Sequence, residues 1–515
     1  MSRPRETELK LECDRLDLTA LGAHPLLQGD GAPATLVSTY FDTPNEDLRA
    51  AGLTLRVRSR GEERIQTVKA EGGAAAAGLF DRPEWESPIA GDAPDPAVYA
   101  DTPVAAILAD AKDARLEPCF TTVVMRRERT LSYGASRISV TLDEGRVETQ
   151  AGDAPLCELE LELEEGTTAD LFALAQALAE TVPLRLGALS KSERGFALRD
   201  GRLGRPSKAG AVVLREDASA GDAFRSIVMA CLRHLRLNEA VFLASRDPEA
   251  LHQIRVSLRR LRSAFSLFKP ILAHDPRAAG LGAEIKQATE PFGRARNLDV
   301  FLETTLPEEM ARRPDEPGLE ELAARLGAER DRAHGTVSEI LASPEWRRLL
   351  LDLLSWLQTG PWLGEGADPA RDEPARDFAA TVLERFRKRV CKRGRHLAKL
   401  DPEARHQVRI AGKKLRYGAD FFASLFPDKK ARKRHKTFSA ALSDLQDHLG
   451  ALNDLATAHS VMASLADGPP GVAASGPALF AAGLTAADNE ARTKQLLAAA
   501  EEAHDDLSDA KPFWR

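Results

Sequence analysis

At 515 residues the chain is too long for one ordinary core, so we expect two or three domains. It is 43% hydrophobic and 29% charged, with a net charge of −7. Its start, MSRPRETELK, lacks the apolar core of a signal peptide. No apolar run approaches the roughly 18 residues that span a bilayer, so we expect no membrane partner. Five widely spaced cysteines without a CxxC pair argue against a disulfide framework or a zinc site and favour the cytoplasm.

The chain divides into two parts of different texture. Residues 1–200 hold 22 basic and 35 acidic residues, whereas residues 201–515 hold 49 and 43. The first part contains short alternating runs such as TLRVRSR and CELELELEEG, which are typical of antiparallel strands. From about residue 220, long stretches have helical spacing, and RDGRLGRPSKAGA between the parts is typical of a linker. We therefore predict an α+β chain with a β-rich domain at 1–200, a linker at 201–215 and an all-α domain at 216–515.

Charged residues occupy alternate positions in the strands expected in the first part. ETELKLE, at residues 6–12, is the first example, and six later strands also pair a charged face with an apolar one. For a single strand, a solvated outer face is the ordinary explanation. Seven such strands favour a closed antiparallel barrel with charges inside, and such charges must be paired, hydrated or bound to ions.

A wall of mixed charge suits one class of ligand. Lysine and arginine neutralise a polyanion, while carboxylates hold a hard divalent cation that bridges its oxygens. Phosphoryl transfer depends mainly on such positioning and charge neutralisation. The pattern therefore predicts a site that hydrolyses polyphosphates, and we can assemble no Ser-His-Asp or Cys-His arrangement that would offer other chemistry.

An ordered set of segments carries a family resemblance. ETELK contains an ExExK signature, and it is followed in order by YFDTP, LRVRSR, QTVKA, RPEWE, TLDEG, CELELELEEG and SKSERGFAL. In these segments residues 1–200 resemble the CYTH family of triphosphate tunnel metalloenzymes, particularly the bacterial inorganic triphosphatases. The resemblance implies a triphosphate tunnel that hydrolyses inorganic triphosphate to pyrophosphate and phosphate with Mg2+ or Mn2+.

The resemblance also implies roles for individual residues. The metal would be bound by Glu6, Glu8 and Glu160, with Glu158 and Glu162 as second choices. The triphosphate would be held by Lys10, Arg56, Arg58, Lys69, Arg126, Lys191 and Arg194, and Asp143 and Glu84 would complete the inner wall. Whether Glu84 or Glu86, and Arg126 or Arg127, points inward stays open. The substrate also stays open, because it could instead be thiamine triphosphate, a nucleoside triphosphate or long polyphosphate. A further alternative is that the protein binds phosphate chains without hydrolysing them.

The helical part contains an internal duplication. HQIRVSLRRLRSAFSLF begins at residue 252, and HQVRIAGKKLRYGADFF begins 154 residues later. The downstream residues Asn297 and Asn453 lie 156 residues apart. Two landmarks with nearly equal offsets indicate a structural repeat.

Each copy of the repeat carries a basic stripe. The stripes, which lie within an arc of about 80° on a helix, consist of His252, Arg255, Arg259 and Arg262, and of His406, Arg409, Lys413 and Arg416. One such stripe is ordinarily a solvated face, but its recurrence favours two helices that present cations to one central polyanion. Aromatic residues, at 5% of the chain, are too few to favour base stacking, so we expect no nucleic-acid partner.

The helical part resembles the CHAD family over roughly residues 216–515. The resemblance rests on both His-x-x-Arg helices and both Asn-containing segments. It implies two four-helix units related by a pseudo-twofold axis, and it implies binding of inorganic polyphosphate. A chain of this kind would associate with polyphosphate granules.

Overall fold

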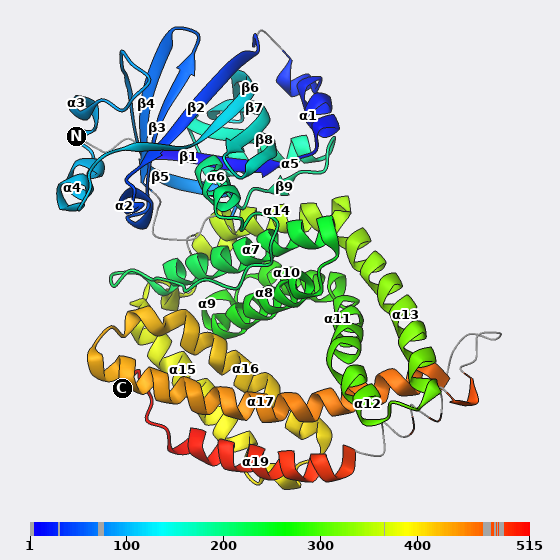
Figure 1. Cartoon of the computed structure of the whole chain (residues 1–515). Coiled ribbons are helices and arrows are strands. Elements are labelled where there is room, and N and C mark those ends of the chain that lie inside the picture. Colours follow the sequence, from blue (N-terminus) through cyan, green and yellow to red (C-terminus); the bar gives the residue numbers. More distant parts are fainter. Residues whose placement is uncertain are drawn as a thin grey trace. The chain divides into compact units, whose positions relative to one another are not determined.

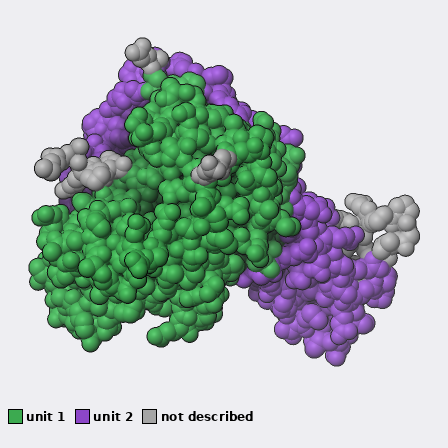
Figure 2. Space-filling view, turned by 90° about the horizontal axis from the view of Figure 1, so that it is seen from above, with its two compact units in different colours: residues 1–207, 232–244, 342–364 green, residues 208–231, 245–341, 365–515 purple. Residues whose placement is uncertain are grey.

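A computed structural model describes residues 5–28, 31–70, 77–364, 366–466, 475–477, 480, 483 and 489–515 (Figure 1). The chain forms two compact units, which Figure 2 shows in different colours. Unit 1 comprises residues 1–207, 232–244 and 342–364, and unit 2 comprises residues 208–231, 245–341 and 365–515. Unit 1 therefore takes in two stretches of chain that follow the linker predicted at 201–215.

Unit 1 is built on a closed antiparallel barrel of eight strands (Figure 1). The strands are β1 (Arg5–Glu12), β2 (Ala34–Asp42), β3 (Leu53–Arg60), β4 (Glu63–Ala70), β5 (Leu79–Pro88), β6 (Glu117–Tyr133), β7 (Ser136–Thr149) and β8 (Gly152–Glu165). They follow the order β5-β4-β3-β2-β6-β7-β8-β1, and pairing of β5 with β1 closes the barrel. A short β9 (Arg185–Leu186) pairs with β1 outside this ring. The predicted barrel is confirmed.

Strand β5 begins earlier than its RPEWE segment suggests. A proline is ordinarily confined to the start or the edge of a strand, yet Pro83 lies inside β5. Residues 79–83 of β5 pair with β1, and residues 84–88 pair with β4. Pro83 thus lies where the strand changes partner, a place at which a missing N–H interrupts neither run of pairs.

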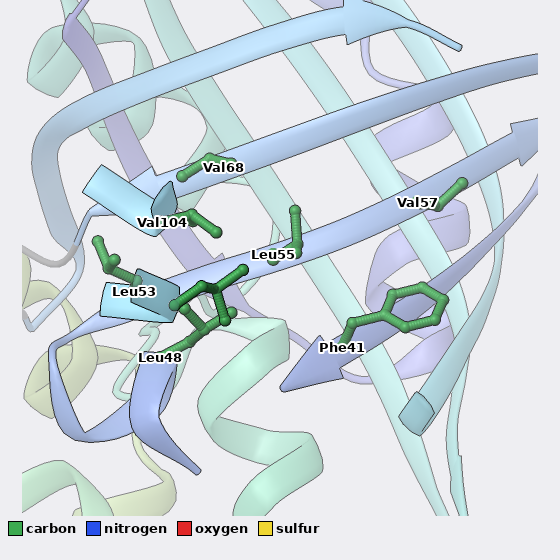
Figure 3. Packing of buried hydrophobic residues seen from close by; sticks show 8 residues of the cluster. Phe41, Leu48, Leu53, Leu55, Val57, Val68 and Val104 are labelled. Carbon is green, nitrogen blue, oxygen red and sulfur yellow. The ribbon is translucent and has the colours of Figure 1, made fainter. Parts of the chain in front are cut away.

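The apolar faces of β3 and β4 point away from the barrel interior. Phe41, Leu55, Val57 and Val68 pack against Leu48 and Val104 of two short helices (Figure 3). Burial of each such side chain contributes about 1.5–3 kcal/mol. The helices of unit 1 are α1 (Arg15–Gly22), α2 (Asp47–Ala50), α3 (Pro96–Tyr99), α4 (Pro103–Asp110), α5 (Thr168–Ala179), α6 (Lys191–Arg199) and α14 (Pro344–Thr359). Helix α5 contacts β6, β7 and β8, and α14 contacts α5 and β9.

Helix α6 fills one end of the barrel interior. Phe196 packs edge-on against Phe120, which stacks on Tyr40 with ring centroids 4.6 Å apart. A Cβ on Gly195 would come within 2.1 Å of the Phe120 ring, so only glycine allows this close approach. The helix begins with a capping box in which Ser190 and Glu193 satisfy each other's backbone N–H groups.

Unit 2 is helical. Its helices include α8 (Pro248–Leu267), α9 (Lys269–Leu272), α10 (Pro276–Ala288), α11 (Phe292–Val300), α12 (Leu306–Arg312), α13 (Pro317–Ala342), α15 (Ala375–Arg393), α16 (Pro402–Phe422), α17 (Lys429–Ala466) and α19 (Asn489–Asp509), while α7 (Ala220–Ser245) runs through both units. Within the described residues, no helix is both long and apolar enough to cross a bilayer.

The duplicated segments occupy matching places in unit 2. Helix α8 contacts α11, and its counterpart α16 contacts α17; α8 also contacts α16, and α11 contacts α17. Both copies begin with an aspartate N-cap followed by proline, at Asp247 and Asp401, a start that satisfies backbone N–H groups and suits the first helical turn. A barrel followed by a duplicated helical domain is the predicted fold class.

Candidate functional site

A charged cavity of about 190 Å³ lies inside the barrel. Its lining includes most of the residues that the sequence predicted for the site. These are Glu6, Glu8, Lys10, Arg56, Arg58, Lys69, Glu84, Arg126, Glu160, Glu162 and Lys191. The residues on strands converge because odd–even alternation turns one set of side chains inward. The first turn of α6 supplies Lys191.

Three predicted residues lie outside the cavity lining. Asp143 and Glu158 are fully buried behind it. Asp143 accepts two hydrogen bonds from the guanidinium of Arg126, at 2.8 and 2.7 Å. Arg194 is directed elsewhere, and its Nη2 donates to Glu12 at 2.9 Å.

One carboxylate group in the wall is neutralised by lysines. Asp143, Glu158 and Glu160 offer oxygens within 4.8 Å of one another. Nζ of Lys191 lies 2.8, 2.9 and 2.6 Å from these three carboxylates, and Lys10 pairs with Glu158 and Glu160. Burial raises the pKa of Glu160, but the charges of the two lysines and Arg126 outweigh it and hold that pKa well below its usual range. This trio is therefore a poor place for a further cation.

Glu8 and Glu162 are in the opposite situation, because the charges around them are mainly negative. Glu8 faces Glu162 directly across the β1–β8 ladder, an arrangement that destabilises a sheet. Burial, followed by the charge of Glu160, raises the pKa of Glu8 to about 7. Burial together with Glu6, Glu8 and Glu84 raises the pKa of Glu162, which is more exposed, to about 7.

This second group offers the oxygen donors that a hard divalent cation prefers, although among the described residues only the lysine-paired trio brings its oxygens within 4.8 Å of one another. Oε1 of buried Glu8 accepts no hydrogen bond from the described residues, although Nζ of Lys10 lies 3.5 Å away. Glu6 is partly neutralised, because Nζ of Lys69 lies 2.9 and 2.8 Å from its two oxygens. A donor set of carboxylate oxygens is the one that Mg2+ and Mn2+ prefer. Glu6, Glu8 and Glu162 could hold such an ion, with Glu160 beside them.

The cavity also carries an excess of positive charge on the β3 and β6 strands. Burial and the neighbouring cations Arg56 and Arg126 lower the pKa of Arg58 to about 10. Arg56 reaches Glu86 only at 3.7 Å. Guanidinium groups forced together in this way favour an anion that shares their charge.

The structure resolves two orientations that the sequence left open. Glu84 and Glu86 both line the cavity, as does Arg126, whereas Arg127 does not. The lining also includes residues that sequence reasoning missed: Tyr40, Thr54, Thr67, Arg82, Glu128, Thr141, Ser190 and Ser192. Arg82 carried a signal, because it alternates with Glu84, but the hydroxyl residues carried none.

In unit 2 the two basic stripes converge. The pKa of Lys413 falls to about 7 because of burial and the charges of Arg409, Arg259 and Arg416. Burial, Arg259, Arg296 and Arg409 likewise lower the pKa of Arg255 to about 10. Arg259 of α8 therefore lies among the cations of α16, and the two helices share one basic cluster.

Other predicted members of the stripes lie nearer the edge of this basic cluster. Burial and the cation Arg296, which the sequence analysis missed, lower the pKa of half-buried His252. His406 and Arg262 are exposed. The second Asn-containing segment lines the same cluster: Asn453 accepts a hydrogen bond from Arg409 at 3.3 Å, and the charge of Asp454 acts on Arg409.

Comparison with known families divides the chain in the same order. The profile of the CYTH domain matches residues 4–196, and that of the CHAD domain matches residues 226–463. An inorganic triphosphatase of Haemophilus influenzae is 28% identical over 169 residues, which cover 32% of this chain and 46% of that protein. The chain thus spans about half the length of this relative.

Solved structures resemble each part. The CHAD domain of the plant Ricinus communis is 32% identical, covers 58% of this chain and 96% of its own, and has a TM-score of 0.51. A Hippeastrum protein described as a putative adenylyl cyclase with a dominant triphosphatase activity is 17% identical. It covers 38% of this chain and 97% of its own with a TM-score of 0.28, too low to bear on function.

Proposed function

Because the chain belongs to the CYTH and CHAD families, in that order along its sequence, we propose that its barrel is a metal-dependent hydrolase of inorganic triphosphate. The observation that carries the proposal is that one cavity contains both a group of crowded cations and a group of crowded carboxylates. Arg58 lies among cations, whereas Glu8 and Glu162 lie among carboxylates. A polyanion together with a divalent cation relieves both at once.

The side chains have separate tasks in this proposal. Arg56, Arg58 and Arg126 hold phosphate oxygens and take up the charge that develops during transfer. Glu160, kept ionised by its lysine partners, can orient the attacking water. A Mg2+ or Mn2+ ion held by the carboxylates would supply further charge neutralisation and lower the pKa of a bound water.

The helical domain is proposed to bind inorganic polyphosphate. Its support is the shared cation cluster of α8 and α16, which crowds Lys413 and Arg255 enough to lower their pKa values. Phosphate recognition without base recognition suits this cluster. A cytoplasmic location at polyphosphate granules belongs to the same proposal.

A phosphate-release assay tests the barrel's activity. The full chain is incubated with Mg2+ or Mn2+ and with inorganic triphosphate, thiamine triphosphate, a nucleoside triphosphate or long polyphosphate. We expect the highest kcat/KM for inorganic triphosphate and loss of turnover in a chelator. Faster release from another substrate would reassign it. Tight binding of triphosphate without release would instead favour a protein that holds phosphate chains without turnover.

A further inference from the structure

A second basic cavity, of about 490 Å³, lies in unit 1 on another side of α6. Helix α6, the segment 202–207 and the part of α7 at 233–241 supply most of its wall. Six guanidinium groups line it, from Arg49, Arg194, Arg202, Arg205, Arg233 and Arg236. The carboxylates in the lining are Glu12 and Glu193.

These two carboxylates are already shared among the arginines. Glu12 accepts from Arg194 at 2.9 Å and lies 3.5 Å from Arg236. Glu193 pairs with Arg233 at 2.6 Å. Nε of Arg194 is buried and has no hydrogen-bond partner within the described chain. Three of the arginines also pair with carboxylates outside the lining, Arg49 and Arg202 with Asp200 and Arg236 with Glu239. Within the lining itself guanidinium groups outnumber carboxylates, and guanidinium forks match phosphate oxygens in geometry.

The second cavity adjoins the barrel cavity. Thr54 and Ser192 line both, and the Oγ1 of Thr54 donates to the Oγ of Ser192 at 3.1 Å. Helix α6 serves both cavities as well, because Lys191 lines the first and Arg194 lines the second. Two small hydroxyl side chains thus form the partition between two cation-rich spaces.

We infer that the second cavity is a binding site for inorganic pyrophosphate, the larger product of the barrel reaction. The volume lies within the range of small-molecule sites, and guanidinium groups from α6, the segment 202–207 and α7 favour an anion with several phosphate oxygens. That the anion is a reaction product rests on the proposed function; that the cavity binds phosphate anions does not.

Site-specific protection of arginines tests the inference. The full chain, free of metal, is treated with phenylglyoxal, and modification is read peptide by peptide by mass spectrometry. Arg202 and Arg205 are exposed, and Arg215 is an exposed control in unit 2. We expect pyrophosphate to protect Arg202 and Arg205 at concentrations that leave Arg215 reactive.

A filled cavity provides the matched comparison. Ala240 lies on the exposed side of α7 and lines the cavity, whereas Ala244, one turn further on, is exposed and does not. Ala240→Trp should raise the half-protecting pyrophosphate concentration at least tenfold, while Ala244→Trp should leave it unchanged.

The outcomes separate this inference from the proposed function, since no turnover is measured. Equal protection in the two tryptophan variants, or no protection of Arg202 and Arg205, overturns the site. Stronger protection by adenosine monophosphate than by pyrophosphate overturns the choice of an inorganic ligand.

Discussion

Single charged side chains in the barrel are placed at a cost to the fold. Glu8 is almost completely buried, faces Glu162 across the ladder and has a pKa of about 7, against an ordinary value of 4.5. A residue that served the fold alone would be paired, as Glu158 is with Lys10 and Lys191. Glu8 has only a distant cation, Nζ of Lys10 at 3.5 Å, and its Oε1 accepts no hydrogen bond from the described residues. We interpret this weakly paired carboxylate as a position kept for a ligand.

Glu8→Gln tests this interpretation at the level of one residue. Because loss of an outer-shell partner already costs about 10–100-fold in metal affinity or activity, loss of a direct ligand should lower kcat/KM by about 100-fold or more. The melting temperature should stay equal or rise, since a buried charge among like charges is removed. Thermal unfolding and triphosphate hydrolysis measure the two effects.

Glu63→Gln is the control for this change, because Glu63 is an exposed carboxylate at the start of β4. It should alter neither quantity. Hydrolysis by Glu8→Gln at the unmodified rate would remove Glu8 from the metal site, and a large loss of stability would show that its charge supports the fold.

At the scale of elements, α6 sets the geometry of the barrel interior. Its first turn brings Lys191 and Ser192 to the cavity, and its middle rests on Phe120 through Gly195. Lys191 in turn holds Asp143, Glu158 and Glu160 together. The position of this helix and the geometry of the charged cavity are therefore coupled.

Gly195→Ala should displace α6. A Cβ that meets an aromatic ring at 2.1 Å requires movement of the helix or the ring, and such overpacking costs about 1–3 kcal/mol. We expect a lower melting temperature together with a lower kcat. Gly91→Ala, where a Cβ meets open space, should change neither. An unchanged kcat in a destabilised Gly195→Ala would mean that Lys191 keeps its place without this packing.

Helices α8 and α16 make a second prediction at this scale. In the free protein the pKa of Lys413 is about 7, whereas a bound polyanion favours the charged lysine and raises that pKa. Above pH 7, binding must therefore take up a proton, and the logarithm of affinity should fall by up to about one unit per pH unit. Below pH 6 this dependence should vanish. Polyphosphate titrations at constant ionic strength between pH 6 and 8.5 measure it.

Lys413→Met should flatten the pH dependence, whereas Lys430→Met, at an exposed position of α17, should keep it. An unaltered slope in Lys413→Met would assign the proton uptake to another group of the cluster.

The inward faces could be predicted from alternation, because the side-chain period of a strand is two. The ion-pair partner of each inward side chain could not be predicted. Glu160 and Glu162 are identical in type and face, yet register places Lys10 opposite Glu160 and Glu8 opposite Glu162. One carboxylate is neutralised and the other is not. Arg194 shows the same limit, since helical spacing does not tell which of two cavities it reaches.

At the scale of the whole molecule, the barrel unit is assembled from three stretches of chain. Residues that line the charged barrel cavity all lie within 1–200. Yet Nε of Arg236 donates to the Leu186 carbonyl at 2.9 Å, and Arg347 donates to the Pro183 carbonyl at 2.8 Å. Helix α14 also covers α5. The charged cavity is therefore formed by residues 1–200 alone, whereas the stability of the barrel unit also depends on residues 232–244 and 342–364.

A fragment ending at Gly201 separates these two dependences. It keeps every cavity-lining residue, so its folded molecules should hydrolyse triphosphate with the kcat of the full chain. Without residues 232–244 and 342–364 it exposes apolar surface on α5 and leaves backbone carbonyls without their arginine donors, a loss of several kcal/mol. Because 1 kcal/mol shifts the melting temperature of a domain this size by about 2–4 °C, the melting temperature of the fragment should be lower by roughly 10 °C.

The fragment is compared with the barrel unit in the full chain. The unfolding transition of that unit is the one whose melting temperature rises when triphosphate is added, since a ligand stabilises the unit that binds it. A fragment as stable as that transition would show that the barrel needs neither later stretch. A stable but inactive fragment would show that they contribute to the catalytic cavity.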